Sequence, residues 1–162
     1  EAERAYDWLV GLQRPDGAWH QYYVVDGVED DKFDANVIAY VADVPATVEF
    51  YERAFGLARR LVGPDGDYAE MDTGATTLAF AAASLAHSNL AASGGYLELD
   101  PAAPPVGVSI TLICDDVPAA VATAGAAGAV LSVDTHEMPW GQTVAYVRDP
   151  DGLLVELGTP VT

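Results

Sequence analysis

The chain contains Asn36-Val-Ile-Ala-Tyr-Val-Ala-Asp-Val-Pro-Ala-Thr-Val and, in its second half, Ser109-Ile-Thr-Leu-Ile-Cys-Asp-Asp-Val-Pro-Ala-Ala-Val. The two stretches align without a gap and share the segment Asp-Val-Pro-Ala. In both, an apolar run typical of a strand is followed by a helix start, with Asp as the cap and Pro in the first turn. An internal repeat of this kind decides the architecture before any single residue does. It predicts two copies of one strand–helix unit and pairs Asn36 with Ser109.

A second similarity follows each copy. Pro64-Asp-Gly66 precedes Glu70-Met-Asp-Thr73, and Pro150-Asp-Gly152 precedes Glu156-Leu-Gly-Thr159. We interpret both tripeptides as hairpin turns and both following segments as strands that carry an inward glutamate. This alignment pairs Glu70 with Glu156.

The apolar pattern between these motifs predicts the remaining elements. In the first copy a helix runs from about Pro45, with the apolar stripe Val48, Tyr51, Ala54 and Phe55, to Gly56. The strands that we expect are 37–41, 57–62, 68–71, 76–81, 108–114, about 129–133, 143–147 and 153–158, and the second helix is about 117–127. Residues 82–105 are rich in Ala, Ser and Pro, and read as a linker with a short helix near 84–90.

Composition excludes some partners. The chain has 162 residues, enough for one domain, and a formal charge of −18 from 7 Lys and Arg against 25 Asp and Glu. Such a charge repels nucleic acid and anionic membrane surfaces and attracts cationic or metal-bearing small molecules. The alternative is an acidic surface that only keeps the protein in solution.

No feature indicates export or a membrane. Cys114 is the one cysteine, so an internal disulfide is impossible, and we interpret it as a core thiol rather than a nucleophile. No apolar stretch approaches the ~20 residues of a membrane span, and no signal peptide is visible. A cytoplasmic protein is the default expectation.

Two segments resemble a known family. They are 41–57, Val-Ala-Asp-Val-Pro-Ala-Thr-Val-Glu-Phe-Tyr-Glu-Arg-Ala-Phe-Gly-Leu, and 140–156, Trp-Gly-Gln-Thr-Val-Ala-Tyr-Val-Arg-Asp-Pro-Asp-Gly-Leu-Leu-Val-Glu. Together with the repeat, they are similar to the glyoxalase/bleomycin-resistance group of the vicinal oxygen chelate superfamily over about residues 36–161. The resemblance implies an α+β fold of two βαβββ modules, about 36–81 and 106–161. It also implies a shared cup and a homodimer in which modules are sometimes exchanged between chains.

Residues 1–35 do not fit this pattern, and we expect an N-terminal extension there. Ala5, Trp8, Leu9 and Leu12 fall on one helical face. The spacing Gln13…Gly17…Trp19 resembles one repeat of the prenyltransferase and terpenoid-cyclase helical folds. One such repeat cannot bury its own face, so we expect it to cover a sheet, a dimer partner or a larger helical protein, or to be an incompletely ordered tail.

The resemblance also names candidate metal positions. Metal-dependent members hold a divalent ion with one side chain from the first strand and one glutamate from the last strand of each module. These positions map to Asn36, Glu70, Ser109 and Glu156, the same four that the repeat pairs. Metal-dependent lyases of the group carry histidine or glutamine on the first strands, so Asn36 and Ser109 predict that no metal is held, although two carboxylates suit a divalent ion. The histidines, His20, His87 and His136, lie outside these strands.

Aromatic residues define the expected ligand site. Trp140, between Pro and Gly at a loop–strand junction, and the tyrosines Tyr40 and Tyr96 are candidates for an aromatic wall beside Glu70 and Glu156. Aromatic rings and carboxylates together suit a flat cationic ligand. Each tyrosine taken alone also fits a packing role.

We therefore expect a dimeric binding protein that sequesters a small molecule in the cup between its modules and needs no cofactor. The main alternative is a metal-dependent lyase or isomerase in which Glu70 or Glu156 abstracts a proton next to a carbonyl. A dioxygenase is disfavoured because its set of two histidines and one carboxylate is missing from the mapped positions.

Overall fold

The computed structural model describes residues 36–74 and 76–161. The N-terminal extension that we expected at 1–35, with its helix and its prenyltransferase-like spacing, lies outside the described residues. Among the described helices, none is both long and apolar enough to cross a membrane.

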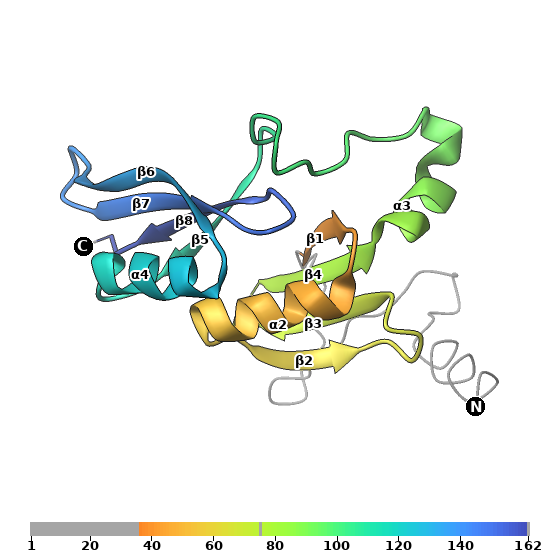
Figure 1. Cartoon of the computed structure of the whole chain (residues 1–162), viewed down its shortest axis with the longest axis horizontal. Helices are drawn as coiled ribbons and strands as arrows, with labels where there is room; N and C mark the ends of the chain where they lie inside the picture. Colours follow the sequence, from red (N-terminus) through yellow and green to blue (C-terminus); the bar gives the residue numbers. More distant parts are fainter. Residues whose placement is uncertain (1–35, 75, 162) are drawn as a thin grey trace, which may run out of the picture. The chain divides into compact units, whose positions relative to one another are not determined.

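The described residues form two βαβββ modules in an α+β fold, as the sequence predicts (Figure 1). The first module has the strand order β1-β4-β3-β2, and the second has the corresponding order β5-β8-β7-β6. The elements of the first module are β1 (Asn36–Val41), α2 (Val44–Phe55), β2 (Ala58–Val62), β3 (Tyr68–Asp72) and β4 (Thr77–Ala82). Those of the second are β5 (Ser109–Ile113), α4 (Val117–Ala127), β6 (Val130–Glu137), β7 (Thr143–Arg148) and β8 (Leu154–Gly158).

Between the modules, the expected linker begins with a helix. Helix α3 (Ala83–Leu90) follows β4 directly and is continued by one 3-10 turn (Ala91–Ser93). No strand follows until β5, so most of the linker runs without regular structure, as its composition predicts.

Both module helices begin and end as the repeat predicts. The Asp43 carboxylate accepts a hydrogen bond from Ala46 N at 3.0 Å, and Asp116 accepts one from Ala119 N at the same distance. Each satisfies one of the free amide groups of a first helical turn. Gly56 ends α2 with φ 67°, a left-handed conformation in which a β-carbon is strained.

Alternation along each strand separates a core face from an opposite face. Ala69 and Met71 of β3 lie in the apolar core with α2, and Val155 and Leu157 of β8 lie in the core with α4. Side chains between them, Glu70 among them, therefore point to the face away from the helices.

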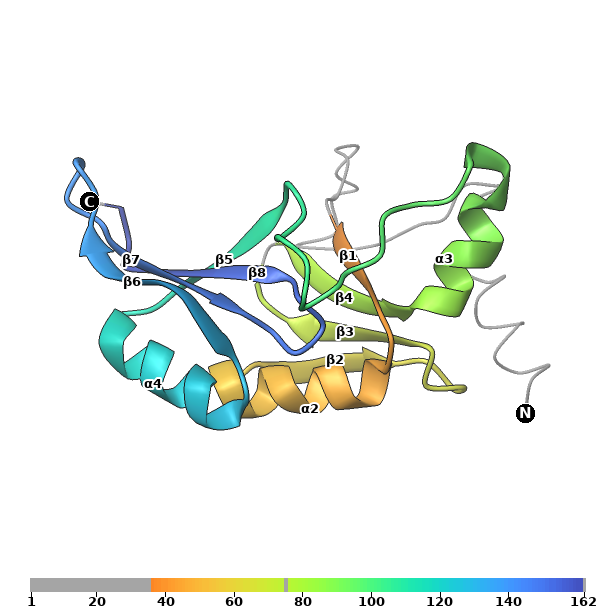
Figure 2. The same ribbon diagram turned by 45° about the horizontal axis from the view of Figure 1, so that its top comes forward.

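The two modules are joined through their helices and one turn. Helices α2 and α4 contact one another, and they meet near their ends (Figures 1 and 2). The turn between β7 and β8 contacts α2: Tyr51 Oη donates to Asp149 Oδ2 at 3.0 Å, and Thr47 Oγ1 donates to Asp151 Oδ2 at 2.6 Å. Asp149 is only 2% exposed, and this burial raises the pKa of its carboxyl from 3.8 to about 6. A buried, hydrogen-bonded carboxylate therefore holds the second module against the first.

The linker is fastened to the second module by Arg148. Its guanidinium donates to the carbonyl oxygens of Asp100 (2.8 Å), Ala103 and Gly152. Gly152 has φ 98°, and a β-carbon there would lie 2.8 Å from the Pro101 nitrogen and 2.7 Å from the Arg148 guanidinium. Glycine is therefore required at 152 both by its backbone conformation and by the approach of the linker.

We predict that Asp149 makes stability fall as pH rises. The unfolded chain releases this proton near pH 3.8 and the folded chain near pH 6, so the folded state binds more protons in between. The stabilisation is therefore complete below about pH 4 and is lost as pH rises through 6. Relative to Asp149→Asn, the wild type should lose up to ~3 kcal/mol of unfolding free energy over this range.

Urea denaturation of both proteins at several pH values between 4 and 7.5 measures this difference. Subtracting the two curves removes the contribution of the other acidic residues, which are common to both proteins. A difference that does not change with pH would show that Asp149 titrates normally.

Candidate functional site

The four sequence-predicted metal positions are not symmetric in the structure. Asn36 begins β1 and Ser109 begins β5, so this pair is equivalent, as the repeat predicts. Glu70, however, lies in β3, the third strand of its module, whereas Glu156 lies in β8, the fourth. Our pairing of Glu70 with Glu156 was therefore wrong.

The cause of the error is the turn motif. Pro64-Asp-Gly66 connects β2 to β3, whereas Pro150-Asp-Gly152 connects β7 to β8. Pro-Asp-Gly serves almost any tight turn, because it supplies a fixed φ, a side-chain acceptor and a free φ. It therefore marks a turn without saying which turn of the module it is.

The strand of the first module that corresponds to β8 is β4, with the sequence Thr-Leu-Ala-Phe-Ala-Ala and no carboxylate. In the register of the first sheet, Ala79 of β4 stands opposite Glu70 of β3. In the second, Glu156 of β8 stands opposite Tyr146 of β7. A last-strand glutamate is thus present in the second module and absent from the first.

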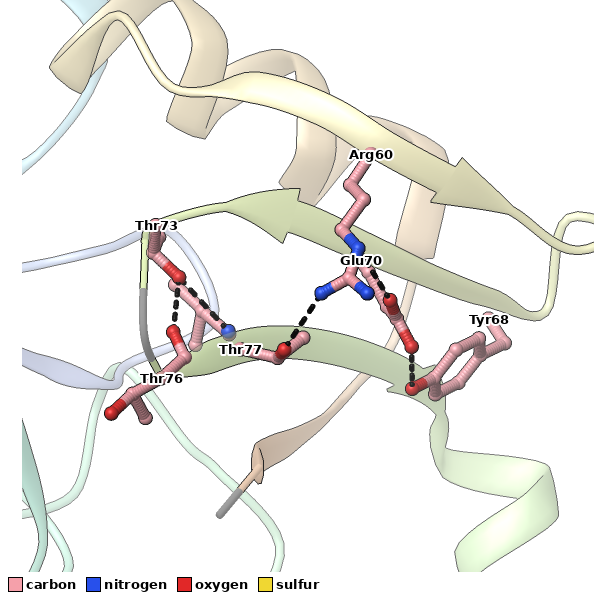
Figure 3. Close-up of polar contacts among 7 residues, drawn as sticks. Arg60, Tyr68, Glu70, Thr73, Thr76 and Thr77 are labelled. Carbon is pink, nitrogen blue, oxygen red and sulfur yellow. Dashed lines mark hydrogen bonds and ion pairs between the residues drawn. The ribbon is translucent and has the colours of Figure 1, made fainter. Parts of the chain in front are cut away.

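Glu70 lies in a polar cluster of its own module (Figure 3). It is 7% exposed, accepts a hydrogen bond from Tyr68 Oη at 2.9 Å, and lies 3.7 Å from Arg60 Nε. Arg60 also donates to Thr77 Oγ1 at 3.1 Å. Burial, followed by the hydrogen bond to Glu70, raises the pKa of Tyr68. Both oxygens of Glu70 are thus engaged by protein groups, one of them cationic.

Glu156 lies in a more exposed environment than Glu70. It is half-buried, and Thr111 Oγ1 of β5 donates to its Oε1 at 3.3 Å. Tyr146 across the β7–β8 pair is hydrogen-bonded to it as well, and this bond is the main cause that raises the Tyr146 pKa. Its partners among residues 36–74 and 76–161 are neutral hydroxyl groups, whereas Glu70 has Arg60 beside it.

These donors do not fit a divalent cation. Three of the mapped groups are an amide (Asn36), a hydroxyl (Ser109) and one carboxylate (Glu156), while Glu70 is held by Arg60 on a non-equivalent strand. Divalent ions in proteins are bound by several carboxylates, carbonyls or imidazoles together. In residues 36–74 and 76–161, no three His, Cys, Asp or Glu side chains gather at a common point.

Tyr40 and Tyr96 are brought together. Their ring centroids are 5.4 Å apart with planes tilted by 55°, and the Tyr96 ring also packs on His87 of α3. His87 Nε2 lies 2.7 Å from Glu98 Oε1. The rings pack against one another, so this cluster anchors the linker on β1 and leaves no slot between the two tyrosines for a flat ligand.

Trp140 lies in the turn between β6 and β7 and is 56% exposed. Its indole Nε1 donates to Gln142 Oε1 at 3.1 Å, and Gln142 Nε2 donates to Thr159 O at 2.7 Å. No contact joins it to the described aromatic residues of the first module. Within the described part of the chain, Trp140 has no ring contact with Tyr40 or Tyr96, and the ligand wall expected from these three residues stays a prediction.

A cavity of about 870 Å³ lies between the two modules. Its walls are Val37 of β1, the end of α2 with Gly56 and Leu57, the β3–β4 turn with the start of β4, β5 with Cys114 after it, Ala120 and Thr123 of α4, and Leu157 of β8. Most of this surface is apolar, and hydroxyl groups of Thr and Ser are interspersed in it. Volume and lining are those of a site for a small organic molecule.

The lining differs in charge from the rest of the protein. No aspartate or glutamate lines the cavity, and Arg53 is its one ionised side chain among the described residues. Of the site residues that the sequence predicted, Asn36, Glu70, Glu156 and the aromatic residues do not line it, whereas Ser109 does. The sequence analysis expected a cup between the modules but missed most residues that line this cavity, because their meeting depends on how the two modules dock.

Comparison with protein families gives one match that spans most of the chain. The family model of the Glyoxalase/Bleomycin resistance protein/Dioxygenase superfamily matches residues 35–157. No curated protein sequence matches the chain.

Solved structures share the fold at low identity. A family enzyme from Burkholderia phytofirmans PsJN has a TM-score of 0.65 and 22% identity, covering 79% of this chain and 98% of that one. A glyoxalase-related enzyme from Fulvimarina pelagi has a TM-score of 0.64 and 20% identity, covering 78% and 86%. TioX from Micromonospora sp. ML1 has a TM-score of 0.58 and 22% identity, covering 79% and 98%.

At such identities the structures show the common fold and leave the ligand and the reaction open. The family model spans both modules and includes the two segments whose resemblance the sequence displays. This chain therefore belongs to the Glyoxalase/Bleomycin resistance protein/Dioxygenase superfamily.

Proposed function

We propose that this chain is a binding protein that sequesters a small organic molecule, without transforming it, in the cavity between its modules. The observation that carries the proposal is the cavity itself: about 870 Å³, mostly apolar, with hydroxyl groups that can orient a ligand. Its residues come from both modules, so a ligand there would contact both and stabilise their docking.

The alternative is a metal-dependent lyase or isomerase that uses Glu70 or Glu156. Proton abstraction at a carbonyl-adjacent carbon needs a free base, together with a group that stabilises the negative charge that develops. Glu70 is hydrogen-bonded to Tyr68 and lies beside Arg60, and the strand that corresponds to β8 has no glutamate. These features favour binding over catalysis.

Two features of the protein have opposite effects on the ligand charge that it should prefer. The net charge of −18 attracts cations at long range, which is the support for a cationic drug as the ligand. The lining contributes no carboxylate and contains Arg53. Preference for a cation would therefore depend on the long-range field, which salt screens beyond ~8 Å at physiological ionic strength.

We also propose a homodimer. Three apolar side chains of the edge strand β6 are exposed: Val130 66%, Leu131 48% and Val133 46%. Exposed apolar patches of this kind mark interaction surfaces. A cytosolic location is part of the proposal and rests on Cys114, the chain's one cysteine.

The neutral dye Nile red tests the cavity. Thr123 of α4 lines it and neighbouring Ala122, also exposed, does not. Thr123→Phe should fill part of the space and weaken dye affinity about tenfold or more, ~1.4 kcal/mol. Ala122→Phe, the matched control on the same helix, should bind as the wild type does.

Equal dye binding by both variants would place the dye elsewhere and contradict the proposal. Ethidium, a flat cation, then tests ligand charge in the same assay. Its affinity should exceed that of a neutral analogue only at low salt, because the attraction is long-range.

Metal binding separates the proposal from its alternative. Incubation with nickel, zinc or manganese, followed by desalting and elemental analysis, should leave far less than one ion per chain, because the donors do not fit such ions. Stoichiometric metal that is lost in Glu156→Ala, but kept in the non-equivalent Glu70→Ala, would instead favour the lyase.

Light scattering tests the dimer. The full chain should have twice its 17.0 kDa mass, and Val133→Glu should return it to the monomer by placing a charge on the exposed apolar surface. A monomeric wild type at micromolar concentration would refute the dimer.

A further inference from the structure

One edge of the second sheet has backbone groups without a strand partner. Strand β5 is the end strand in the order β5-β8-β7-β6 and pairs, among the described strands, with β8 alone. Cys114 N donates to Gly158 O at 2.9 Å, directly after β5. Because backbone groups alternate in direction along a strand, those of Thr111 and Ile113 point away from β8.

This free edge borders the cavity. All six consecutive residues 109–114 line it. Successive side chains of a strand point to opposite faces of the sheet, so they cannot all line one cavity. Residues 109–114 can therefore all face it only through their backbone, at the edge of the sheet. The cavity wall is therefore a row of amide and carbonyl groups as well as apolar side chains.

Two of the four edge strands, β2 and β6, are protected, whereas β1 (Asn-Val-Ile-Ala-Tyr-Val) and β5 are not. The outer strand β2 has a bulge and the charges of Arg59 and Arg60, and the outer strand β6 has two bulges and carries Asp134 and Glu137. Bulges and charges prevent an edge from pairing with a further strand. Strand β5 has the uncharged sequence Ser-Ile-Thr-Leu-Ile, no proline and a regular register with β8.

The opposite wall suits a chain that pairs with this edge. Phe55, Leu57 and Leu78 offer apolar contact to side groups, and Thr73 and Thr76 lie at the β3–β4 turn. No carboxylate of the described residues lines the cavity to repel the carbonyl oxygens of a ligand.

We propose that the ligand of this cavity is an extended chain with secondary amides and apolar side groups, such as a short uncharged peptide, that adds to β5 as a further strand. The inference rests on the proposed function, because it names the ligand class for the same cavity. In this mode, main-chain hydrogen bonds supply affinity and the side-group contacts supply selectivity. The donors and acceptors are the backbone groups of Thr111 and Ile113.

The ligand-side test compares two peptides on the full wild-type chain. The probe is acetyl-Val-Thr-Val-Thr-Val-amide, and its control carries N-methyl groups on the central amides. Methylation removes donors and blocks approach to a strand edge but keeps the apolar groups. Calorimetric titration should show the control to be at least about tenfold weaker.

The protein-side test places proline on the free edge. Thr111→Pro removes an amide that β8 does not use, and proline is tolerated at such positions of edge strands. It should weaken binding of the probe peptide at least about tenfold. Ser132→Pro, in a bulge of the opposite edge strand β6, is the matched control and should leave peptide binding unchanged.

The outcomes separate this inference from the proposed function. Equal binding of both peptides, or Nile red binding without peptide binding, would overturn strand addition and leave the cavity as a binding site. If the wild type binds neither the dye nor the peptide, the proposed function is overturned as well. Dissociation of the dimer by Thr111→Pro would show that a second copy occupies the edge, again against the inference. If circular dichroism shows that Thr111→Pro does not fold, the comparison of the two peptides still decides.

Discussion

The docking of the β7–β8 turn on α2 is the constraint on which the rest of the molecule depends. The described strands pair only within their own module, so these hydrogen bonds do not fix where one module lies relative to the other. That position is set by the packing of α2 on α4 and by two side-chain contacts, Tyr51 to Asp149 and Thr47 to Asp151. The cavity between the modules exists because these contacts hold its walls at a fixed separation.

Burial of Asp149 strengthens its hydrogen bond to Tyr51, and it also raises the free energy that is lost when a hydrogen-bond partner is removed. Asp149 accepts hydrogen bonds from Tyr51 and from the backbone amide of Leu153, and it is almost completely shielded from water. Removing one partner would leave a buried polar group unsatisfied. The same shielding raises the carboxyl pKa, so the contact between modules responds to pH whereas the backbone pairing inside each module does not.

The sequence predicts the fold well because its strongest pattern is local. Asp43 and Asp116 cap helices at the positions that the repeat gives, and the alternation of apolar residues defines each strand. The site is predicted less well. Pro-Asp-Gly is turn chemistry common to many turns, and it led to the false equivalence of Glu70 and Glu156. The neighbours of Glu70 were partly visible, since Tyr68 and Glu70 stand two residues apart on one strand and must share a face. The lining of the cavity could not be predicted, because residues such as Phe55, Thr73 and Thr123 meet only through tertiary docking.

The hydrogen bonds from Arg148 to the linker affect how a chain of this kind could exchange a module with a second copy. Since Arg148 holds Asp100 and Ala103 to the second module, the carboxyl-terminal part of the linker travels with that module. Gly94 and Gly95, both with positive φ, lie upstream of these contacts and end the 3-10 turn by donating to Ala91 O and Leu90 O. Exchange of a module between two chains would leave every described strand pair intact, and the change would be confined to a few dihedral angles at these glycines. In evolutionary terms, a tandem duplication joined by such a hinge can move between closed monomers and intertwined oligomers through substitutions in the linker alone.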